Sequence, residues 1–191
     1  MQITPQILEN HIVRLEPLTE QHREPLRPLA NDMSMWPQTT MQGNGEHFDT
    51  WFDAMLSATQ AGKQISHAVF DKAADQYVGH SAYLVISVDH KRLEIGWTWY
   101  EASVRGSKIN PACKRLLIGN AFDNGAERVE LKTAAINKRS QAAMRKMGAT
   151  EEGTLRRHIL TWNGEWRDTV WFSILKEEWP SARDGLDARL V

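Results

Sequence analysis

A basic loop that leads into a helix is the feature that most constrains the fold of this chain. It reads Arg-Gly-Ser-Lys-Ile-Asn-Pro-Ala-Cys-Lys-Arg and runs from Arg105 to Arg115. Asn110 is a favoured N-cap and Pro111 costs nothing at a first helical position, so the pattern predicts a helix that begins here. Cations crowd an end where the helix dipole already favours negative charge. We therefore expect a phosphate or pyrophosphate on the free backbone N–H groups; a solvated basic turn is the alternative.

Predicted strands flank this helix on both sides. Apolar and polar residues alternate over Leu93–Trp99 and again over Arg128–Thr133, which is typical of strands. A second helix then opens at Asn137 and ends at Gly148. This order of elements predicts a crossover unit, in which a ligand lies at the strand ends and the helix N-terminus.

The remaining elements form an antiparallel meander before this unit and a tail after it. Met33–Gly45 reads as a loop, which either folds onto the core or contacts a substrate. The alternating or amphipathic patterns predict strands at Ile12–Leu18, Gln64–Asp71 and Tyr77–Val88, a broken helix from Thr19 toward Asn31, a helix at Glu46–Ala61, and a short surface helix from Glu178 onward.

Near the C-terminal end, Asn163-Gly164 stands between two alternating runs and predicts a hairpin with a two-residue type I′ turn. If Trp162 opposes Glu165, the register follows. The predicted pairs are His158 with Thr169, Arg156 with Trp171 and Ile159 with Asp168, and Arg157 lies within ion-pair reach of Asp168.

Composition fits a single domain over residues 1–191, as a monomer or a homodimer. The chain has 41% hydrophobic residues and a net charge of −1, so a broad basic surface for nucleic acid or anionic membrane is not expected. No apolar run or leader pattern indicates a membrane or secreted protein, and we expect a cytoplasmic one. The one cysteine, Cys113, falls on an apolar helix face and is read as core in preference to a nucleophile.

The order of these motifs resembles the GNAT superfamily of acyl-CoA-dependent N-acetyltransferases, and within it the RimJ/RimL-like branch. The resemblance runs from about Ile12 to Trp179 and depends on Glu94-Ile95-Gly96-Trp97-Thr98, the Arg-Gly-Ser loop, Asn137-x-x-Ser140 and Gly148-Ala149. It implies an α/β (α+β) fold with a mixed, mostly antiparallel twisted sheet of about seven strands, flanked by helices. A splayed central strand pair and a C-terminal hairpin complete the expected fold.

The resemblance also implies the binding residues for acetyl-CoA, the expected co-substrate; no metal is expected. The family loop is written Arg/Gln-x-x-Gly-x-Gly/Ala, and this chain departs from it by placing Lys108 and Asn110 where glycine or alanine is usual. We expect weaker backbone cradling and more side-chain contact as a result. The implied cofactor-binding residues are Trp97, Thr98, Arg105, Gly106, Ser107, Lys108, Asn110, Lys114 and Asn137.

Three residues are candidates for the chemistry. Ser140 matches a position from which a hydroxyl can protonate the leaving thiolate, although a serine in a first helical turn often bonds its own backbone. Glu94 and His158 are candidates for the general base, and each has a plain structural alternative in its strand. Asp168 is read as structural.

These features predict an acetyl-CoA-dependent N-acetyltransferase that acts on a protein N-terminus or a small amine. The alternative is a non-catalytic acyl-CoA-binding sensor module, which the Lys108 departure and the unsettled base leave open. Nucleic-acid binding through Arg156, Arg157, His158 and Arg167 is disfavoured because the chain as a whole is not basic.

Overall fold

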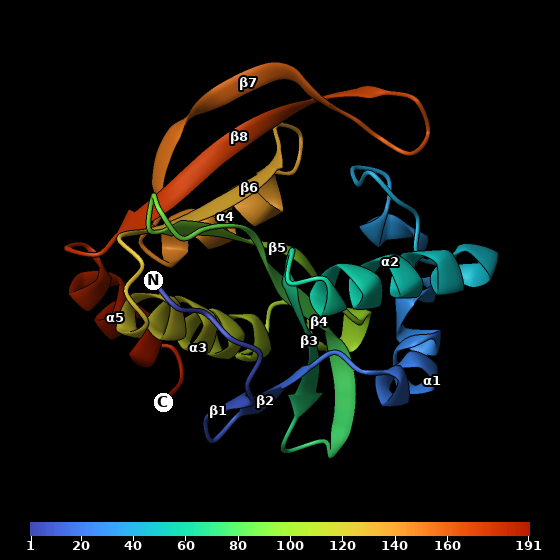
Figure 1. Cartoon of the computed structure of the whole chain (residues 1–191), viewed down its shortest axis with the longest axis horizontal. Helices are drawn as coiled ribbons and strands as arrows, with labels where there is room; N and C mark the ends of the chain where they lie inside the picture. Colours follow the sequence, from blue (N-terminus) through green and yellow to red (C-terminus); the bar gives the residue numbers. More distant parts are fainter.

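The computed structural model describes all of residues 1–191 as one eight-stranded sheet with helices on both faces (Figure 1). The sheet order is β1-β2-β3-β4-β5-β6-β8-β7, with β5 and β6 as the one parallel pair. The strands are β1 (Leu8–Glu9), β2 (Val13–Pro17), β3 (Ile65–Asp71), β4 (Gln76–Ser87), β5 (Arg92–Tyr100), β6 (Arg128–Ala134), β7 (Thr150–Leu160) and β8 (Trp166–Leu175). The expected fold class is confirmed. Strand β1 was not predicted, because two residues are too few to show an alternating pattern.

The helices divide between the two faces of the sheet. On one face, α3 (Ile109–Asp123), α4 (Lys138–Lys146) and α5 (Trp179–Asp187) share a core of 29 buried residues with the strands. On the other face, α1 (Arg23–Leu26) and α2 (Phe48–Gln60) enclose a smaller core of ten buried residues with β3 and β5. None of these helices is both long and apolar enough to cross a membrane.

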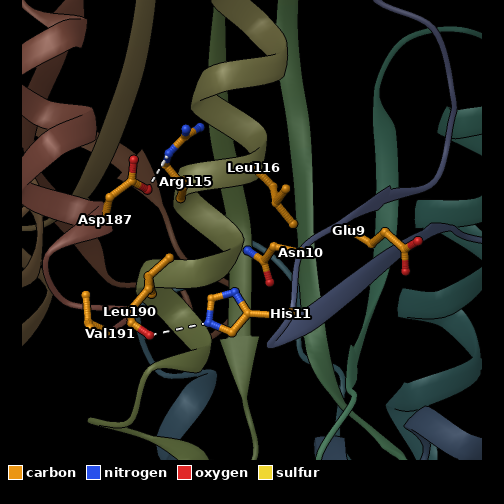
Figure 2. A pocket seen from close by; sticks show the side chains of 8 residues that line it. All are labelled: Glu9, Asn10, His11, Arg115, Leu116, Asp187, Leu190 and Val191. Atoms are coloured by element: carbon orange, nitrogen blue, oxygen red, sulfur yellow. Dashed lines mark hydrogen bonds and ion pairs between the residues drawn. The ribbon is translucent and has the colours of Figure 1, made fainter.

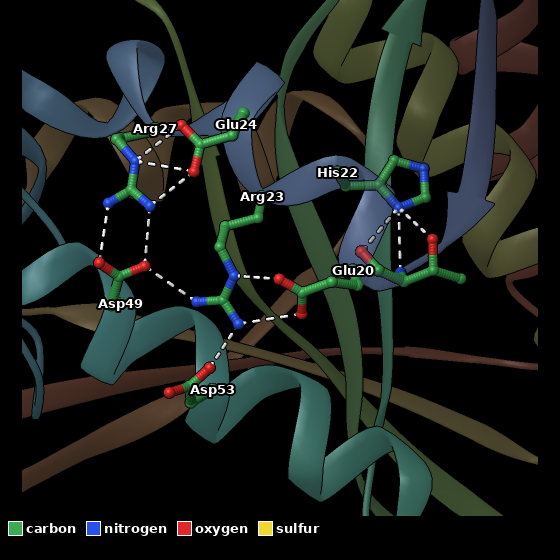
Figure 3. Close-up of polar contacts among 8 residues, drawn as sticks. Glu20, His22, Arg23, Glu24, Arg27, Asp49 and Asp53 are labelled. Carbon is green, nitrogen blue, oxygen red and sulfur yellow. Dashed lines mark hydrogen bonds and ion pairs between the residues drawn. The ribbon is translucent and has the colours of Figure 1, made fainter.

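The second core is held by an apolar stripe on α2 and an ion-pair network above it. Phe48, Trp51, Phe52 and Met55 recur at helical spacing and are all buried. Figure 3 shows Arg23 and Arg27 of α1 joined to carboxylates of both helices, including Asp49 at 2.9 and 2.8 Å. The carboxylates are more than half exposed, so this network orients α1 on α2 more than it stabilises the fold.

The segment between α1 and α2 folds onto this core and also meets the hairpin. Short 3₁₀ turns occupy Pro28–Asn31, Met33–Met35 and Gly45–His47. Trp36 is only 1% exposed, and its Nε1 donates to the carbonyl of Ala30 at 2.9 Å. Its own carbonyl accepts from Nε1 of Trp162, also at 2.9 Å. The loop therefore lies on the core and beside the tip of the β7–β8 hairpin.

The central strands separate after three paired positions. β5 and β6 pair from Arg92–Arg128 to Glu94–Glu130; beyond them β5 follows β4 while β6 continues along β8. The β4 register also shifts between His80 and Ala82, where Trp97 adopts a positive φ of 48°. The expected splayed pair is confirmed, with a bulge in β5 at the splay.

The hairpin tip is where expected, but the predicted register is wrong. Thr161 pairs with Glu165 through a backbone bond, and the amide of Gly164 donates to the carbonyl of Thr161, so the loop has three residues. Gly164 alone has positive φ, at 82°, which is the type I turn with a following bulge and not the type I′ turn.

This extra loop residue changes every pair below it. Ile159 faces Arg167 and Leu155 faces Thr169, with an irregularity between them where Arg157 has a φ of 47°. The predicted ion pair is replaced by a backbone contact, because the Asp168 carboxylate accepts from the Arg157 amide at 2.7 Å. Asp168 thus supports the bulge in β7.

Candidate active site

The bulge in β5 is fixed from both faces of the sheet by consecutive residues of β4. On the α2 side, Nδ1 of His80 lies 2.8 Å from the Trp97 carbonyl. Burial lowers the pKa of His80 to about 4, so the ring is neutral and this nitrogen donates. On the α3 side, Oγ of Ser81 lies 2.7 Å from Oγ1 of Thr98. The backbone of Trp97 and Thr98 is therefore held rigidly at the splay.

Lys114 completes this support from inside the protein. Its side chain is buried, and Nζ lies 2.8 Å from Oγ1 of Thr98 and 3.4 Å from Oγ of Ser81. Burial lowers the pKa of its ammonium to about 8. We expected Lys114 to face the phosphates at the loop; in the structure it points under the bulge instead, because its position on α3 faces the sheet.

The helix begins two residues earlier than predicted. The N-cap of α3 is Lys108, whose carbonyl accepts from the Ala112 amide, and Oγ of Ser107 accepts from the Ile109 amide at 3.2 Å. Pro111 is the third helical residue, still inside the first turn, where amides lack intrahelical partners. Asn110 is thus the second helical residue and not the predicted N-cap.

Two of the loop cations are already engaged with the protein. Arg105 contacts Asp32 at 2.7 Å through Nη1, and its Nε donates to the Tyr100 carbonyl at 2.8 Å. Lys108 donates to the carbonyls of Leu190 and Val191. Arg105 thus ties the loop after β5 to the segment before α2. The remaining donors of the loop are the backbone amides of Gly106 and Lys108, which bond no group of the chain, and Nη2 of Arg105, which is buried without a partner.

The N-terminus of α4 lies at the end of β6, on the other side of the splay. Oδ1 of Asn137 accepts from the Ser140 amide at 3.0 Å, which confirms the predicted cap. No hydrogen bond joins the Ser140 hydroxyl to the chain, and the residue is partly exposed. The hydroxyl is thus free to meet a ligand, in contrast to the alternative of a serine that bonds its own backbone.

Glu94 and His158, the two candidate bases, lie around one lysine that sequence analysis missed. Nζ of Lys132 on β6 lies 2.8 Å from Oε2 of Glu94, whose side chain is 2% exposed. Burial raises the pKa of this carboxyl, and the pair with Lys132 partly offsets the shift. Lys132 also lies 4.9 Å from the centre of the Trp171 ring, which His158 meets edge-on at 5.8 Å.

His158 is exposed on β7, and partial burial followed by the charges of Lys132 and Arg167 lowers its pKa. It is therefore largely neutral at pH 7. The signal for Lys132 was present in the sequence, because alternation puts residues 130 and 132 on one face of a strand beside Glu94. Only the crossover pairing could say which face.

A surface hollow of about 640 Å³ contains none of these residues (Figure 2), although Leu190 and Val191, which line it, accept from Lys108. It is bordered by Asn10 and His11 after β1, Arg115 of α3 and Asp187 of α5, with Arg115 and Asp187 paired at 2.7 Å. None of the residues lining it belongs to the predicted site. Cys113 is no alternative nucleophile either, since burial raises the pKa of its thiol to about 12. No group of His, Cys, Asp or Glu side chains is arranged to hold a metal ion.

The residues present fit an acyl-CoA. A splay with a rigid bulge offers backbone groups to an extended arm, a helix-start loop offers amides to a pyrophosphate, and Asn137 and Ser140 stand at the opposite edge. This combination defines the acyl-CoA-dependent acyltransferase class.

Comparison with known proteins identifies the family. Residues 13–150 match the family model of the acetyltransferase (GNAT) domain, so the chain belongs to the GNAT family, whose members use acetyl-CoA. A Bacillus subtilis (strain 168) protein, provisionally named ribosomal N-acetyltransferase YdaF, is 35% identical over 91 residues. That match covers 47% of this chain and about half, 49%, of the relative. It agrees with the RimJ/RimL-like resemblance.

Solved structures agree over the whole chain. A protein of T. thermophilus, provisionally called an acetyltransferase, is 30% identical with a TM-score of 0.88, and the match covers 100% of both chains. A GCN5-related N-acetyltransferase from Brucella melitensis is 28% identical with the same TM-score, covering 99% of this chain and 87% of that one. Mycobacterium smegmatis RimJ, solved with CoA-disulfide, shares the fold at 21% identity and a TM-score of 0.81, covering 96% and 94%.

Proposed function

We propose that the chain transfers the acetyl group of acetyl-CoA directly to a primary amine, either a protein N-terminal α-amine or a small-molecule amine. The observation that supports this proposal is the splay at Glu94, where β5 carries a bulge and a buried carboxylate and separates from β6, the strand that leads to the α4 N-terminus and Ser140. Family membership supports the acetyl donor, and the acceptor follows from the chemistry of the site.

The reaction needs two proton transfers, one to the departing thiolate and one from the attacking amine, and different residues carry them out. The amine nitrogen attacks the thioester carbonyl carbon, and the carbon–sulfur bond breaks. The Ser140 hydroxyl donates a hydrogen bond to the departing thiolate and passes it a proton, which a solvent water replaces on the serine oxygen. Backbone amides near Trp97 and Thr98 donate to the carbonyl oxygen as it gains charge. The bulge is fixed by His80, Ser81 and Lys114, so these donors need little reorganisation.

The amine proton goes to Glu94 or to His158. Glu94 is 2% exposed and so takes the proton through a bridging water, whereas the exposed His158 ring can take it directly. An α-amine with a pKa near 8 is partly neutral at pH 7, unlike a lysine amine near 10.4. A site with two weakly basic candidates therefore favours α-amines and amines of low basicity.

The test is a thiol-release assay with acetyl-CoA against a panel of N-terminal peptides and small amines. We expect turnover with at least one α-amine and little with lysine side chains. Binding of acetyl-CoA without turnover on any acceptor would contradict the enzyme and favour the sensor module. Glu94→Gln and His158→Asn then separate the two bases. The variant that lacks the true base should lose the acidic limb of its pH–rate profile.

A further inference from the structure

Arg167 is the one arginine of this chain that is both partly buried and without a carboxylate partner. No carboxylate lies within 4.0 Å of its guanidinium, which contacts the Gln38 carbonyl and Oγ1 of Thr169. Four other arginines also lack a carboxylate partner, but every one of them is exposed: Arg139, Arg156, Arg157 and Arg189. Arg167 is partly buried, and the remaining arginines are ion-paired.

A partly buried, unpaired guanidinium is costly to fold, because burial removes water from a group that stays charged. Burial lowers the pKa of Arg167, and Glu94 is the carboxylate that acts against this shift. That carboxylate is already paired with Lys132 at 2.8 Å. Lys132 and Arg167 therefore share the one carboxylate of Glu94, because the nearby Glu130 is already paired with Arg92 and Arg128. With His158 largely neutral, an excess positive charge remains.

The guanidinium is also held in one orientation. Its Nη1 donates to the Gln38 carbonyl, while Nε and Nη2 lie 3.3 Å from Oγ1 of the buried Thr169. These contacts use three of its five N–H donors, which leaves two, one on each terminal nitrogen. A pair of donors of this kind matches the two oxygens of a carboxylate.

Arg167 lies beside one candidate base and beside the loop before α2. It stands on β8 opposite Ile159, next to His158, and it reaches the loop at Gln38 that docks against the hairpin. The Trp162 amide bonds the Thr39 carbonyl at 3.1 Å, which fixes that loop to the hairpin beside the guanidinium. Arg167 thus connects the β7–β8 hairpin to the loop at Gln38, on the side of the sheet where Glu94 and His158 lie.

We propose that Arg167 binds a carboxylate on the acceptor, so that the preferred substrate of this site is an amine that also carries a carboxylate. A peptide with an acidic residue beside its N-terminus and a free amino acid both have this chemistry. The proposal rests on the proposed acetyl transfer for its substrate class, while the anion subsite itself is a property of Arg167 alone.

The experiment uses two matched tripeptides that differ only by Glu or Gln at the second position, with a free amino acid and its amide as a second pair. For the parent chain we expect kcat/KM at least about tenfold higher for each acid, the range of a charge-assisted hydrogen-bonded pair. Arg167→Gln should remove this preference, so that the ratio of kcat/KM for the acid to kcat/KM for its neutral partner falls close to one; a change common to both substrates leaves this ratio untouched. Arg167→Lys keeps the positive charge but lacks the paired guanidinium donors, so its preference for the acid should lie between those of the parent and Arg167→Gln.

Arg156→Gln is the matched control, since Arg156 is an exposed, unpaired arginine on the same hairpin, and it should keep the preference. A preference that survives in Arg167→Gln, or its absence in a parent that acetylates both peptides, overturns the proposal. Calorimetric binding of the same peptides separates the two proposals because it needs no turnover. Equal binding of both peptides by the parent overturns the Arg167 subsite, whereas preferential binding of the acid without any turnover supports it and contradicts acetyl transfer.

Discussion

The Lys132 ammonium lies 2.8 Å from the carboxylate of Glu94, across the gap where their parallel strands stop pairing. The contact stabilises the ionised carboxylate against the burial that raises its pKa. Lys132 also repels a proton on His158, whose pKa is lowered by burial and then by this charge. One lysine therefore keeps both candidate bases ready to accept a proton near neutral pH.

Lys132→Met should move the acidic limb of kcat/KM to higher pH, whichever base is used. Its loss removes a positive charge that lowers the pKa of Glu94 and that of His158, so both pKa values rise. The measurement is a pH–rate profile of parent and variant with one acceptor. A limb that stays in place, or moves to lower pH, would show that neither group limits the rate.

Ser140→Ala should lower kcat more than tenfold while the acetyl-CoA dissociation constant changes by less than about threefold, because the hydroxyl acts as the thiolate forms. The fold should be unaffected, since the cap is the Asn137 side chain on the Ser140 backbone amide. Thermal unfolding checks this: Asn137→Ala should cost about 1 kcal/mol and Ser140→Ala almost nothing. Equal losses of rate and stability in Ser140→Ala would identify a structural serine.

Sequence patterns predicted the crossover unit because local signals agree there: alternation marks both strands and Asn137 marks a helix start. The splay came only from the family resemblance. The predicted start of α3 at Asn110 was wrong by two residues, because the helix begins after Lys108 and the contact of the Ser107 hydroxyl with the Ile109 amide does not appear in a local pattern. Lys114 was misread for another reason. Helix α3 is buried on most sides, so a charged residue on it looks solvated until Ser81 and Thr98, from other strands, are placed beneath it.

The hairpin shows the same limit. Asn-Gly marks a turn, but the loop length depends on whether Asn163 takes positive φ, and here its side chain bonds Thr161 and the Glu165 amide instead. Trp162 is further held by the carbonyls of Trp36 and Thr39, which are over a hundred residues away. Such tertiary contacts do not appear in a local pattern, and one extra loop residue shifts every cross-strand pair.

Gly164→Val should destabilise the fold by roughly 1 to 2 kcal/mol, since φ is 82° and a β-branched residue is strained there. No atom lies within 4 Å of the position a Cβ would take, so the cost is conformational and not a clash. Gly164→Asn is the control, because asparagine tolerates this backbone region and should cost clearly less. Equal losses of unfolding free energy for the two variants would mean that steric contact of the new side chain, and not the positive φ, causes the destabilisation.

Lys114 should make stability rise with pH in the alkaline range. Its folded pKa is about 8, below an unfolded value near 10.4. Under pH 8 both states are protonated, and the folded state carries the full cost of burying the ammonium. Between about pH 8 and 10.4 the unfolded state binds more protons, so unfolding free energy increases with pH.

Lys114→Met removes this titration, so the unfolding free energy of the parent minus that of the variant should rise by on the order of 3 kcal/mol from pH 7.5 to 10.5. Urea unfolding at a series of pH values measures the difference, in which all other titrating groups cancel.

At pH 7.5 the variant also loses the contacts that hold Thr98 at 2.8 Å and, through it, the bulge. Its kcat should therefore fall even where its stability equals or exceeds that of the parent. A difference that is flat across pH would show that the amine is hydrated in solution, and an unchanged kcat would show that Ser81 and His80 hold the bulge without it.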